Sequence, residues 1–512
     1  MTAPDATRPA DAATSPMTPV LIGIDVGTTN LKVLATTADG RVLRVVQRDM
    51  VIHRPAHGQA EFDLGVVEAG ILEGLAEIAA TLPAAAEVAA IAIASIGESV
   101  VALDADGAPA SICPTWFDRR THNYRPEFGI PVDRWYDLTG MVDDDICTAF
   151  RIHFLRSHEL VDASRAQRWL CVADYGVHLL TGNACAAPSL AARTGMYDRN
   201  QGTWAPEVLA ALGLAADHLP RPLPTATVAG GLLPEVARRV GLAGGTPVVN
   251  AGHDHPCAGV GCGLVEPGGI MDSTGTAEAI KTVVRGPLNY RETLAGRYEC
   301  YPHAAPGRFI LSGHLPSAGG FLAWLSKTLH GVDEDGSTPV AAVVEAARQS
   351  PPGANGVRVL PFLEGTGEPY NRRDQAAEVL GLRAYHGRAD LIRAAFEGCS
   401  FWFEVNVSTM SRIARQRIDA ITAVGGGARS DLWLEIKSAL VGRPMWVPDV
   451  EEAAAFGAAL VGGMAVGLIG TGAEDLPRLR GRTVTAPDSL RTAYEPVASE
   501  YRALYEQRFG PL

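Results

Sequence analysis

Short apolar runs alternate with longer amphipathic stretches along most of this chain of 512 residues. Short runs rich in Val, Ile and Ala predict strands, and longer stretches with apolar residues three or four positions apart predict helices. Strands are expected at 91–95, 247–251, 270–272, 357–362 and 420–424. Helices are expected at 66–81, 150–158, 319–329, 388–405 and 430–441. This alternation favours an α/β fold.

The apolar run VLIGIDVGTTNLKVL, at 20–34, carries the first candidate chemistry. It predicts a strand that contains Asp25 near its end and then turns sharply. Backbone N–H groups around such a turn form a concavity that binds phosphate oxygens. Asp25 would repel phosphate unless a cation lies between them, and Mg²⁺ is commonly held by one or two carboxylates and several waters. The candidate phosphate-binding residues are Gly27, Thr28, Thr29, Asn30 and Lys32. A tight hairpin turn without a ligand is the alternative interpretation.

A second turn of the same kind lies in the other half of the chain. MDSTGTA at 271–277 repeats the carboxylate and the Gly-Thr turn of IDVGTTN at 24–30. Two such turns suggest two similar domains that face one central cleft. The glycine-rich segment GVGCGLVEPGG, at 259–269, is the expected hinge. We therefore expect a disordered tail and two domains, at 1–18, 19–262 and 263–512.

The stretch VVNAGHDHPCAGVGCG, at 248–263, places His253, Asp254 and His255 after another apolar strand. Three interpretations are open. The three side chains could bind a metal ion, although adjacent residues converge on one ion with difficulty. They could form a structural cluster in a loop. Alternatively, Asp254 could be a general base that accepts a hydroxyl proton while the oxygen attacks a phosphorus atom.

A glycine turn also ends the predicted strand in ITAVGGGARSDLWLEI, at 421–436. Its glycines allow a flat ligand to approach the backbone, and the helix from Ser430 offers its N-terminus to an anion. The chain contains neither a G-x-G-x-x-G nor a GxxxxGK[ST] nor a G-x-S-x-G motif.

The segment EEAAAFGAALVGGMAVG, at 451–467, predicts a helix with alanine or glycine on nearly every face. Such small residues permit close packing at a domain interface that slides. An ordinary buried helix is an equally good interpretation.

Composition narrows the function. Apolar residues make up 47% and charged residues 20% of the chain, as in folded soluble proteins. The net charge of −13 argues against nucleic acid as a partner, because phosphate backbones need a basic face. No apolar run is long enough to span a membrane, and no signal-like segment begins the chain. The eight cysteines form no CxxC pair, which indicates reduced thiols and a cytoplasmic location.

Together these motifs resemble the FGGY family of carbohydrate kinases, in their order along the chain. The matching segments are IDVGTTNLK, AGHDHPCAG, DSTGTAE, GLRAYHGRADLIRAAFEG (381–398), GGGARSDLW and EEAAAFGAAL. In the fourth, Asp390 and Glu397 occupy the acidic positions of the family signature. The resemblance implies two actin-like (ribonuclease H-like) domains around a cleft, the first for sugar and the second for nucleotide. It further implies ATP-dependent phosphorylation of a small sugar or polyol, most simply a pentulose or other ketose. A homodimer is one possible assembly.

The resemblance also implies roles for individual residues. Asp254 would be the catalytic base and Asp25 the carboxylate associated with Mg²⁺. ATP would contact the first turn and also Thr276, Gly319, Gly426, Gly427 and Ser430. The sugar would contact Glu98, Trp116, Asp118, His253 and Asp254, from the segments IASIGESVVALD (93–104), PTWFDRRT (114–121) and AGHDHPCAG.

Glu98 departs from the family pattern. Xylulokinases have Gln-Met-His-Gly where this chain has Ile-Gly-Glu-Ser, and glycerol kinases have an Arg-Glu pair there. A carboxylate accepts hydrogen bonds from vicinal hydroxyls, so Glu98 still suits a polyhydroxylated substrate. The alternative is a structural pair with Arg119 or Arg120. A kinase for another class, such as a sugar acid, tetritol, amino-sugar or signalling molecule, and a non-catalytic ATPase or sugar sensor are rival functions.

Overall fold

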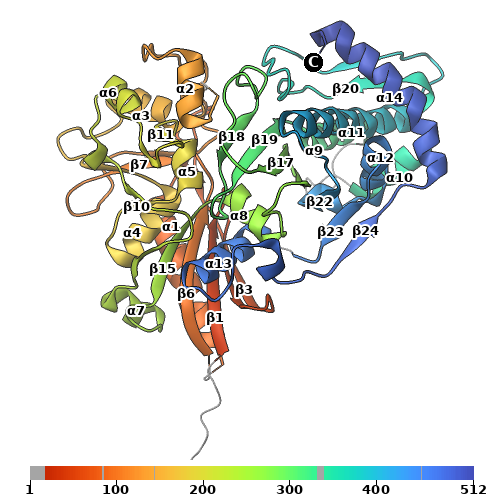
Figure 1. Ribbon diagram of the computed structural model, residues 1–512. Helices are drawn as coiled ribbons and strands as arrows, with labels where there is room; N and C mark the ends of the chain where they lie inside the picture. The colour runs from red at the N-terminus through yellow and green to blue at the C-terminus, as the bar shows by residue number, and fades with distance from the viewer. Residues whose placement is uncertain (1–17, 84–85, 143–144, 331–339, 451, 512) are drawn as a thin grey trace, which may run out of the picture.

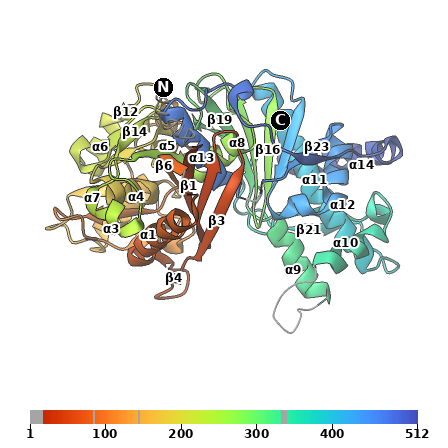
Figure 2. The ribbon, with the colours of Figure 1, turned by 90° about the horizontal axis from the view of Figure 1, so that it is seen from below.

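The computed structural model describes residues 18–83, 86–142, 145–330, 340–450 and 452–511. Two mixed sheets, flanked by helices, stand side by side (Figures 1 and 2). We call residues 18–262 the first half and residues 263–511 the second half. The α/β prediction is confirmed. Residues 1–17 of the expected tail lie outside the described residues, and Thr18 already begins the first strand. No helix of the described chain is long and apolar enough to cross a membrane.

The first-half sheet has six strands in the order β14-β15-β6-β1-β2-β3. These are Val228–Gly231, Pro247–His253, Ala86–Ser95, Thr18–Val26, Asn30–Thr37 and Val42–Asp49. β1, β6 and β15 are parallel, whereas β1 and β2 form the predicted hairpin. Helices α1 and α4 (Leu64–Thr81 and Val172–Thr181) pack on one face of this sheet, together with α7 (Pro234–Val240).

The other face of this sheet is lined by small residues. In β6 the isoleucines at 91 and 93 point towards α1 and α4, and the alanines at 90, 92 and 94 point towards α8 and α13 (Asp254–Gly261 and Ala453–Ala465). A Cβ on Gly23 would lie 1.8 Å from the carbonyl oxygen of Ala455, and one on Gly457 would lie 1.7 Å from that of Cys257. The small residues of the predicted helix therefore permit close packing. This second-half helix is buried against the sheet of the first half.

The second-half sheet has seven strands in the order β18-β19-β17-β16-β22-β23-β24. These are Glu299–Pro302, Phe309–Leu315, Glu278–Val284, Gly269–Thr274, Ala420–Val424, Met445–Pro448 and Gly481–Val484. One face packs against α9, α10, α11, α12 and α14, which are Gly319–His330, Val340–Arg348, Arg388–Ile413, Asp431–Val441 and Asp488–Phe509. The other face meets a small cluster of helices from the first half.

That cluster is an insertion between β6 and β15. Its helices are α2, α3, α5 and α6, at Val132–Thr139, Thr148–Ser157, Pro188–Arg193 and Pro206–Leu212. Small sheets of two or three strands complete the fold: β4, β5 and β8 (Ile52–His53, Glu61–Phe62, Cys113–Pro114), β7 and β9 (Val100–Leu103, Arg168–Cys171), β10 and β13 (Cys185–Ala186, Arg221–Pro222), β11 and β12 (Tyr197–Asp198, Thr203–Trp204), and β20 and β21 (Arg358–Leu360, Glu378–Leu380).

Most predicted elements are present, with shifted ends. The strand expected at 357–362 is limited to Arg358–Leu360, and the helix expected at 388–405 continues to Ile413. Ser430 precedes its helix as the N-cap, with its Oγ accepting from the N–H of Trp433 at 3.4 Å. Glu451, predicted to begin the small-residue helix, lies outside the described residues.

Candidate active site

Three parallel strands deliver the first-half carboxylates to one sheet edge. Val26 of β1 is in register with Ser95 of β6, and Ser95 is in register with His253 of β15. The chain therefore places Asp25, just before the end of β1, close to Asp254, just after the end of β15. The carboxyl ends of parallel strands are where ligands bind in open α/β sheets.

Asp25 is a buried carboxylate with one oxygen left over. Its side chain is 8% exposed, and its Oδ1 atom has no hydrogen-bond partner among the described residues. Burial raises the pKa of Asp25 to about 6, although the charge of Lys32 opposes the shift. Lys32 itself pairs with Glu452, Nζ to Oε2 2.6 Å, just before α13.

The residues around Asp25 fit a Mg²⁺ ion held mainly by phosphate and water. One free carboxylate oxygen is the contribution that Mg²⁺ commonly takes from a protein in nucleotide sites. A complete cage is not present, because the described residues contain no group of three His, Cys, Asp or Glu side chains arranged for a metal. The His-Asp-His metal interpretation therefore finds no support here.

Asp254 begins α8 and lies between its two histidines. Its Oδ1 atom accepts from the N–H of His255 at 2.5 Å and lies 3.1 Å from Nε2 of His253. Burial, and then the neighbouring Asp25 carboxylate, raise the pKa of Asp254 to about 8. Burial lowers the pKa of both histidines, that of His255 to about 3, so both imidazoles are neutral near pH 7.

Three glycine segments of the second half meet at the second turn. A Cβ on Gly319, the first residue of α9, would lie 2.2 Å from the carbonyl oxygen of Gly275. A Cβ on Gly427 would lie 2.6 Å from the side chain of Thr274. The N–H of Gly320 donates to the carbonyl oxygen of Thr276 at 2.9 Å. The predicted nucleotide residues Thr276, Gly319, Gly426, Gly427 and Ser430 thus come from segments that pack on one another.

A buried ion cluster supports this turn from below. Nζ of Lys437, on α12, donates to Asp272 at 2.6 Å, to Glu278 at 2.7 Å and to the hydroxyl of Thr274 at 3.0 Å. Burial alone would lower the pKa of Lys437, but the carboxylates of Asp272 and Glu278 outweigh it, so the pKa is raised. The cluster joins both strands of the β16–β17 hairpin to α12.

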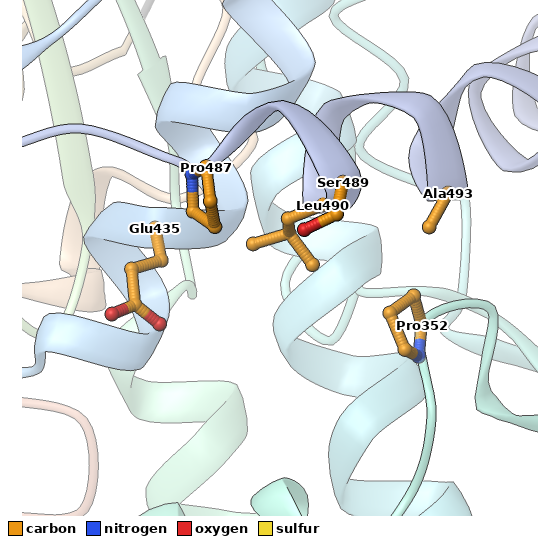
Figure 3. A pocket seen from close by; sticks show the side chains of 6 residues that line it. All are labelled: Pro352, Glu435, Pro487, Ser489, Leu490 and Ala493. Carbon is orange, nitrogen blue, oxygen red and sulfur yellow. The ribbon is translucent and has the colours of Figure 1, made fainter.

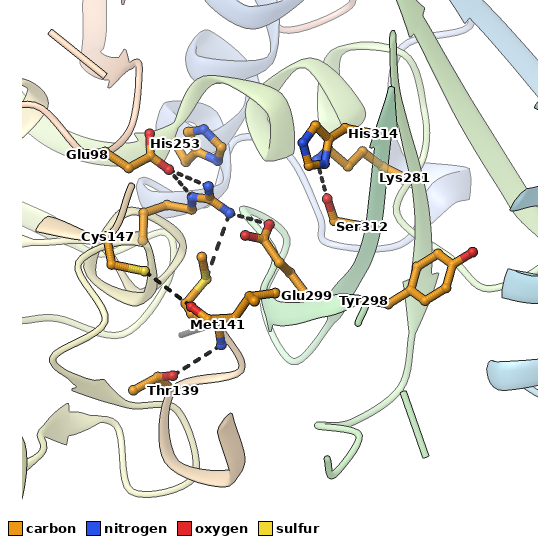
Figure 4. Close-up of polar contacts among 12 residues, drawn as sticks. Glu98, Thr139, Met141, Cys147, His253, Lys281, Tyr298, Glu299, Ser312 and His314 are labelled. Carbon is orange, nitrogen blue, oxygen red and sulfur yellow. Dashed lines mark hydrogen bonds and ion pairs between the residues drawn. The ribbon is translucent and has the colours of Figure 1, made fainter. Parts of the chain in front are cut away.

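Glu98 lies just after the end of β6, and a residue of the insertion pairs with its side chain. Its backbone is in the left-handed region, with φ 64°, and its carboxylate forms an ion pair with Arg193 of α5. Arg193 also forms an ion pair with Glu299 of β18, so it joins the two halves. Figure 4 shows Glu98 and Glu299 on either side of this contact, with His253 beside them.

The structural partner proposed for Glu98 from the sequence is wrong. Arg120 pairs with Asp118 and with Glu61, Nη1 to Oε1 2.9 Å, whereas Arg119 lies 3.8 Å from Glu364. Arg193 takes that place because the insertion folds back over the end of β6, a contact between residues 95 positions apart.

In the Trp-x-Asp segment, Trp116 contacts the first turn, whereas Asp118 stabilises its own loop. Trp116 is 41% exposed and donates from Nε1 to the hydroxyl of Thr28, in the first turn, at 3.1 Å. Asp118 is buried and accepts from the N–H of Ala60 at 2.7 Å and from Arg120. Substrate contact by Asp118 stays a prediction, since its carboxylate already orders the loop.

The second-half sheet adds residues that the sequence analysis missed. Lys281 and Ser312 are register partners on β17 and β19, and Ser312 is also in register with Glu299 on β18. His314 Nδ1 lies 2.8 Å from Glu368 Oε2. A charged residue in the middle of a predicted strand, as Lys281 in EAIKTVV, was the available signal.

Two depressions lie elsewhere, with volumes of about 310 and 460 Å³. Both are lined by Pro352, Glu435 and Leu490, between α12, α14 and the segment before β20 (Figure 3). Neither contains a residue of the carboxylate site, and we assign them no role.

Known proteins match this arrangement over most of its length. Residues 20–261 match the N-terminal domain and residues 272–466 the C-terminal domain of the FGGY family of carbohydrate kinases. The chain therefore belongs to this family. It is 26% identical to a gluconokinase of Bacillus subtilis, covering 95% of this chain and 94% of the other, and 28% identical to a xylulose kinase of Escherichia coli, covering 95% and 98%.

The fold is likewise shared with solved structures of the family. A xylulose kinase from Rhodospirillum rubrum superposes with a TM-score of 0.86 at 24% identity, covering 95% of this chain and 98% of that one. The two predicted actin-like domains are thus confirmed as a fold class, and the chain is a carbohydrate kinase.

Proposed function

We propose that this kinase transfers the γ-phosphoryl group of ATP to a hydroxyl group of a small polyhydroxylated substrate, with Asp254 as the base. The observation that carries the proposal is the buried pair of Asp25 and Asp254 at the shared edge of β1 and β15. A carboxylate whose pKa is raised to about 8 is a stronger base than an exposed one and suits proton transfer near neutral pH.

In this step one bond forms, one bond breaks and one proton moves. The substrate oxygen bonds to the γ-phosphorus while the bond from that phosphorus to the bridging oxygen of ADP breaks, and the hydroxyl proton passes to Asp254. Asp25 would hold Mg²⁺, which supplies positive charge beside the phosphate oxygens. Backbone N–H groups of the turns at Gly27 and Gly275 would orient the phosphates. Such catalysis is mostly positioning and charge stabilisation.

We further propose that residues 19–262 form the sugar-binding domain and residues 263–512 the nucleotide-binding domain. The two separate sheets support this division, although helix α13 of the second half packs on the sheet of the first half. For the acceptor, relatives named as xylulose kinases support a pentulose or similar ketose. Relatives named as gluconokinases support a sugar acid.

The test is ADP release from ATP and Mg²⁺ with a panel of ketoses, polyols and sugar acids. The wild-type protein should respond to at least one compound. Asp254→Asn should lower kcat by about 10²–10⁴-fold and leave ATP affinity nearly unchanged, because a carboxamide cannot take the proton. ATP binding without stimulation by any compound would favour a sensor, and near-normal turnover in Asp254→Asn would remove this residue from the mechanism.

A further inference from the structure

One row of side chains crosses the face of the second-half sheet that meets the first half. Lys281 on β17, Ser312 on β19 and Glu299 on β18 lie side by side in this row by strand register. Ile280 belongs to the apolar core on the opposite face, and Val283 to the cluster shared with the insertion. The alternation of β17 therefore points Lys281 towards the first half.

The cations along this row differ in whether they contact a carboxylate. Arg193 is paired with both Glu98 and Glu299, and His314 is paired with Glu368. Lys281, in contrast, donates to the hydroxyl of Ser312, and it has no carboxylate within ion-pair distance among the described residues.

A buried ammonium without an anion is costly. Lys281 is only 6% exposed, and burial lowers its pKa to about 8 even though Glu299, Glu368 and Asp254 oppose the shift. Unpaired buried charges are rare because the lost hydration is not replaced. Within the described structure, Lys281 therefore has no carboxylate in direct contact, and a ligand anion would supply one.

Lys281 also lies near the proposed base Asp254. Its charge acts on Asp254 and on both neighbouring histidines. Figure 4 shows Lys281 and His314 on one side, with His253 and Glu98 opposite them. Ala279, the next residue of β17 on the same face, adds only a methyl group. A ligand whose hydroxyl reaches Asp254 thus lies near the ammonium of Lys281, which contacts no carboxylate of the described residues.

From these contacts we infer that Lys281 binds a carboxylate of the substrate, so that the acceptor is a short sugar acid rather than a neutral sugar or polyol. A monoanion suits one cation that contacts no carboxylate among the described residues, whereas a phosphorylated sugar would bring a dianion close to Glu299 and Glu368. This inference rests on the proposed phosphoryl transfer at Asp254.

The experiment compares acids with polyols of the same carbon chain. The pairs are gluconate and glucitol, xylonate and xylitol, ribonate and ribitol, and glycerate and glycerol, with xylulose and ribulose as ketoses. ADP release gives kcat/KM, and the melting temperature with each compound reports binding without turnover. The variants are Lys281→Met, Lys281→Arg and, as a matched control, Lys327→Met at an exposed position of α9.

The wild-type protein should prefer the acid of at least one pair by about 10–100-fold in kcat/KM, the range of a charged hydrogen bond. Lys281→Met should abolish that preference, with a loss of kcat/KM on the acid about 10–100-fold larger than any change on the matching polyol. Lys281→Arg should restore part of the preference, and Lys327→Met should retain all of it.

Two results would overturn the inference while leaving the kinase intact. One is a neutral sugar or polyol that reacts faster than every acid of the panel. The other is an equal loss on acid and polyol in Lys281→Met, which would place the lysine in phosphoryl transfer or folding. If no compound reacts, the proposed function fails for these classes of substrate. The melting temperatures then test the binding of acids independently of turnover. Stabilisation by an acid in wild-type protein but not in Lys281→Met supports the inference, and no stabilisation by any acid overturns it.

Discussion

Asp25 and Asp272 lie in corresponding hairpins of the two halves, each shortly before a turn glycine. In the first hairpin, the N–H of Gly27 donates to the carbonyl oxygen of Asn30 at 3.1 Å, and Asp25 keeps one buried oxygen without a partner in the described structure. In the second, Asp272 is fully buried and accepts from Lys437 at 2.6 Å and from Thr274 at 2.9 Å.

The same sequence pattern thus produces two different carboxylates. The unpaired oxygen of Asp25 costs folding free energy and remains available to a ligand. Lys437 neutralises the charge of Asp272, so this carboxylate can hold a turn but not a metal ion. Local sequence gives the hairpin in both cases, and a residue far along the chain, Lys437, decides the role of the second.

The largest effect on stability is expected at the neutralised carboxylate. Lys437→Met leaves Asp272 and Glu278 buried without their cation, and removing one member of a buried pair costs about 3–5 kcal/mol. Chemical denaturation should show this loss in the free energy of unfolding, and KM for ATP should rise because the turn at Gly275 loosens. Lys327→Met, on the surface, is the control. An unchanged unfolding free energy would mean that the cluster does not stabilise the fold.

The opposite behaviour is expected at Asp25. Asp25→Asn should lower kcat by roughly 10² or more, because charge stabilisation of phosphate is lost. Its melting temperature should stay the same or rise, since burial already disfavours the ionised form, with its pKa of about 6. The exposed Asp106→Asn serves as the control. Full activity at saturating Mg²⁺ would reduce the first turn to a hairpin without metal function.

Sequence reasoning located candidate residues where local structure carries the signal. Asp25 lies near the end of the predicted apolar strand β1 and Asp254 directly follows β15, and their roles stay predictions. It failed where a contact depends on long-range folding. Arg193 and Glu299 meet across 106 positions, and their pairing depends on where the insertion docks.

Helix ends were missed for a similar reason. The helix α11 was expected to end at Val405, but it extends to Ile413. It continues because Asn406 is buried, donating from Nδ2 to the carbonyl oxygen of Glu368 at 3.0 Å and accepting from Tyr298 at 2.8 Å. Tertiary contacts of this kind override local propensity.

Glu98 is intermediate between the partly unpaired Asp25 and the fully paired Asp272, because it shares Arg193 with Glu299. If it also binds substrate hydroxyls, Glu98→Gln should raise the substrate KM by roughly 10–100-fold, because a charged hydrogen bond contributes about 1.5–3 kcal/mol. KM for ATP should hardly move, and Arg193 would keep Glu299 as a partner, so the melting temperature should change little. Equal rises in both KM values with a lower melting temperature would instead assign Glu98 to structure.

The smallest expected effect is a pH dependence that distinguishes Lys281 from the paired cations. The groups that interact with this lysine are Arg193, His253, Asp254, His255, Glu299, His314 and Glu368. Because burial lowers the pKa of Lys281 to about 8, its ammonium is present below that pH and is lost as the pH rises through it. The ratio of kcat/KM for a sugar acid to that for its polyol should therefore fall about 10-fold between pH 7 and pH 9, as expected for one titrating group. Taking the ratio cancels the ionisation of Asp254, which both substrates need. In Lys281→Met the ratio should be low and flat across this range, and a wild-type ratio that does not fall with pH would show that Lys281 carries no substrate anion.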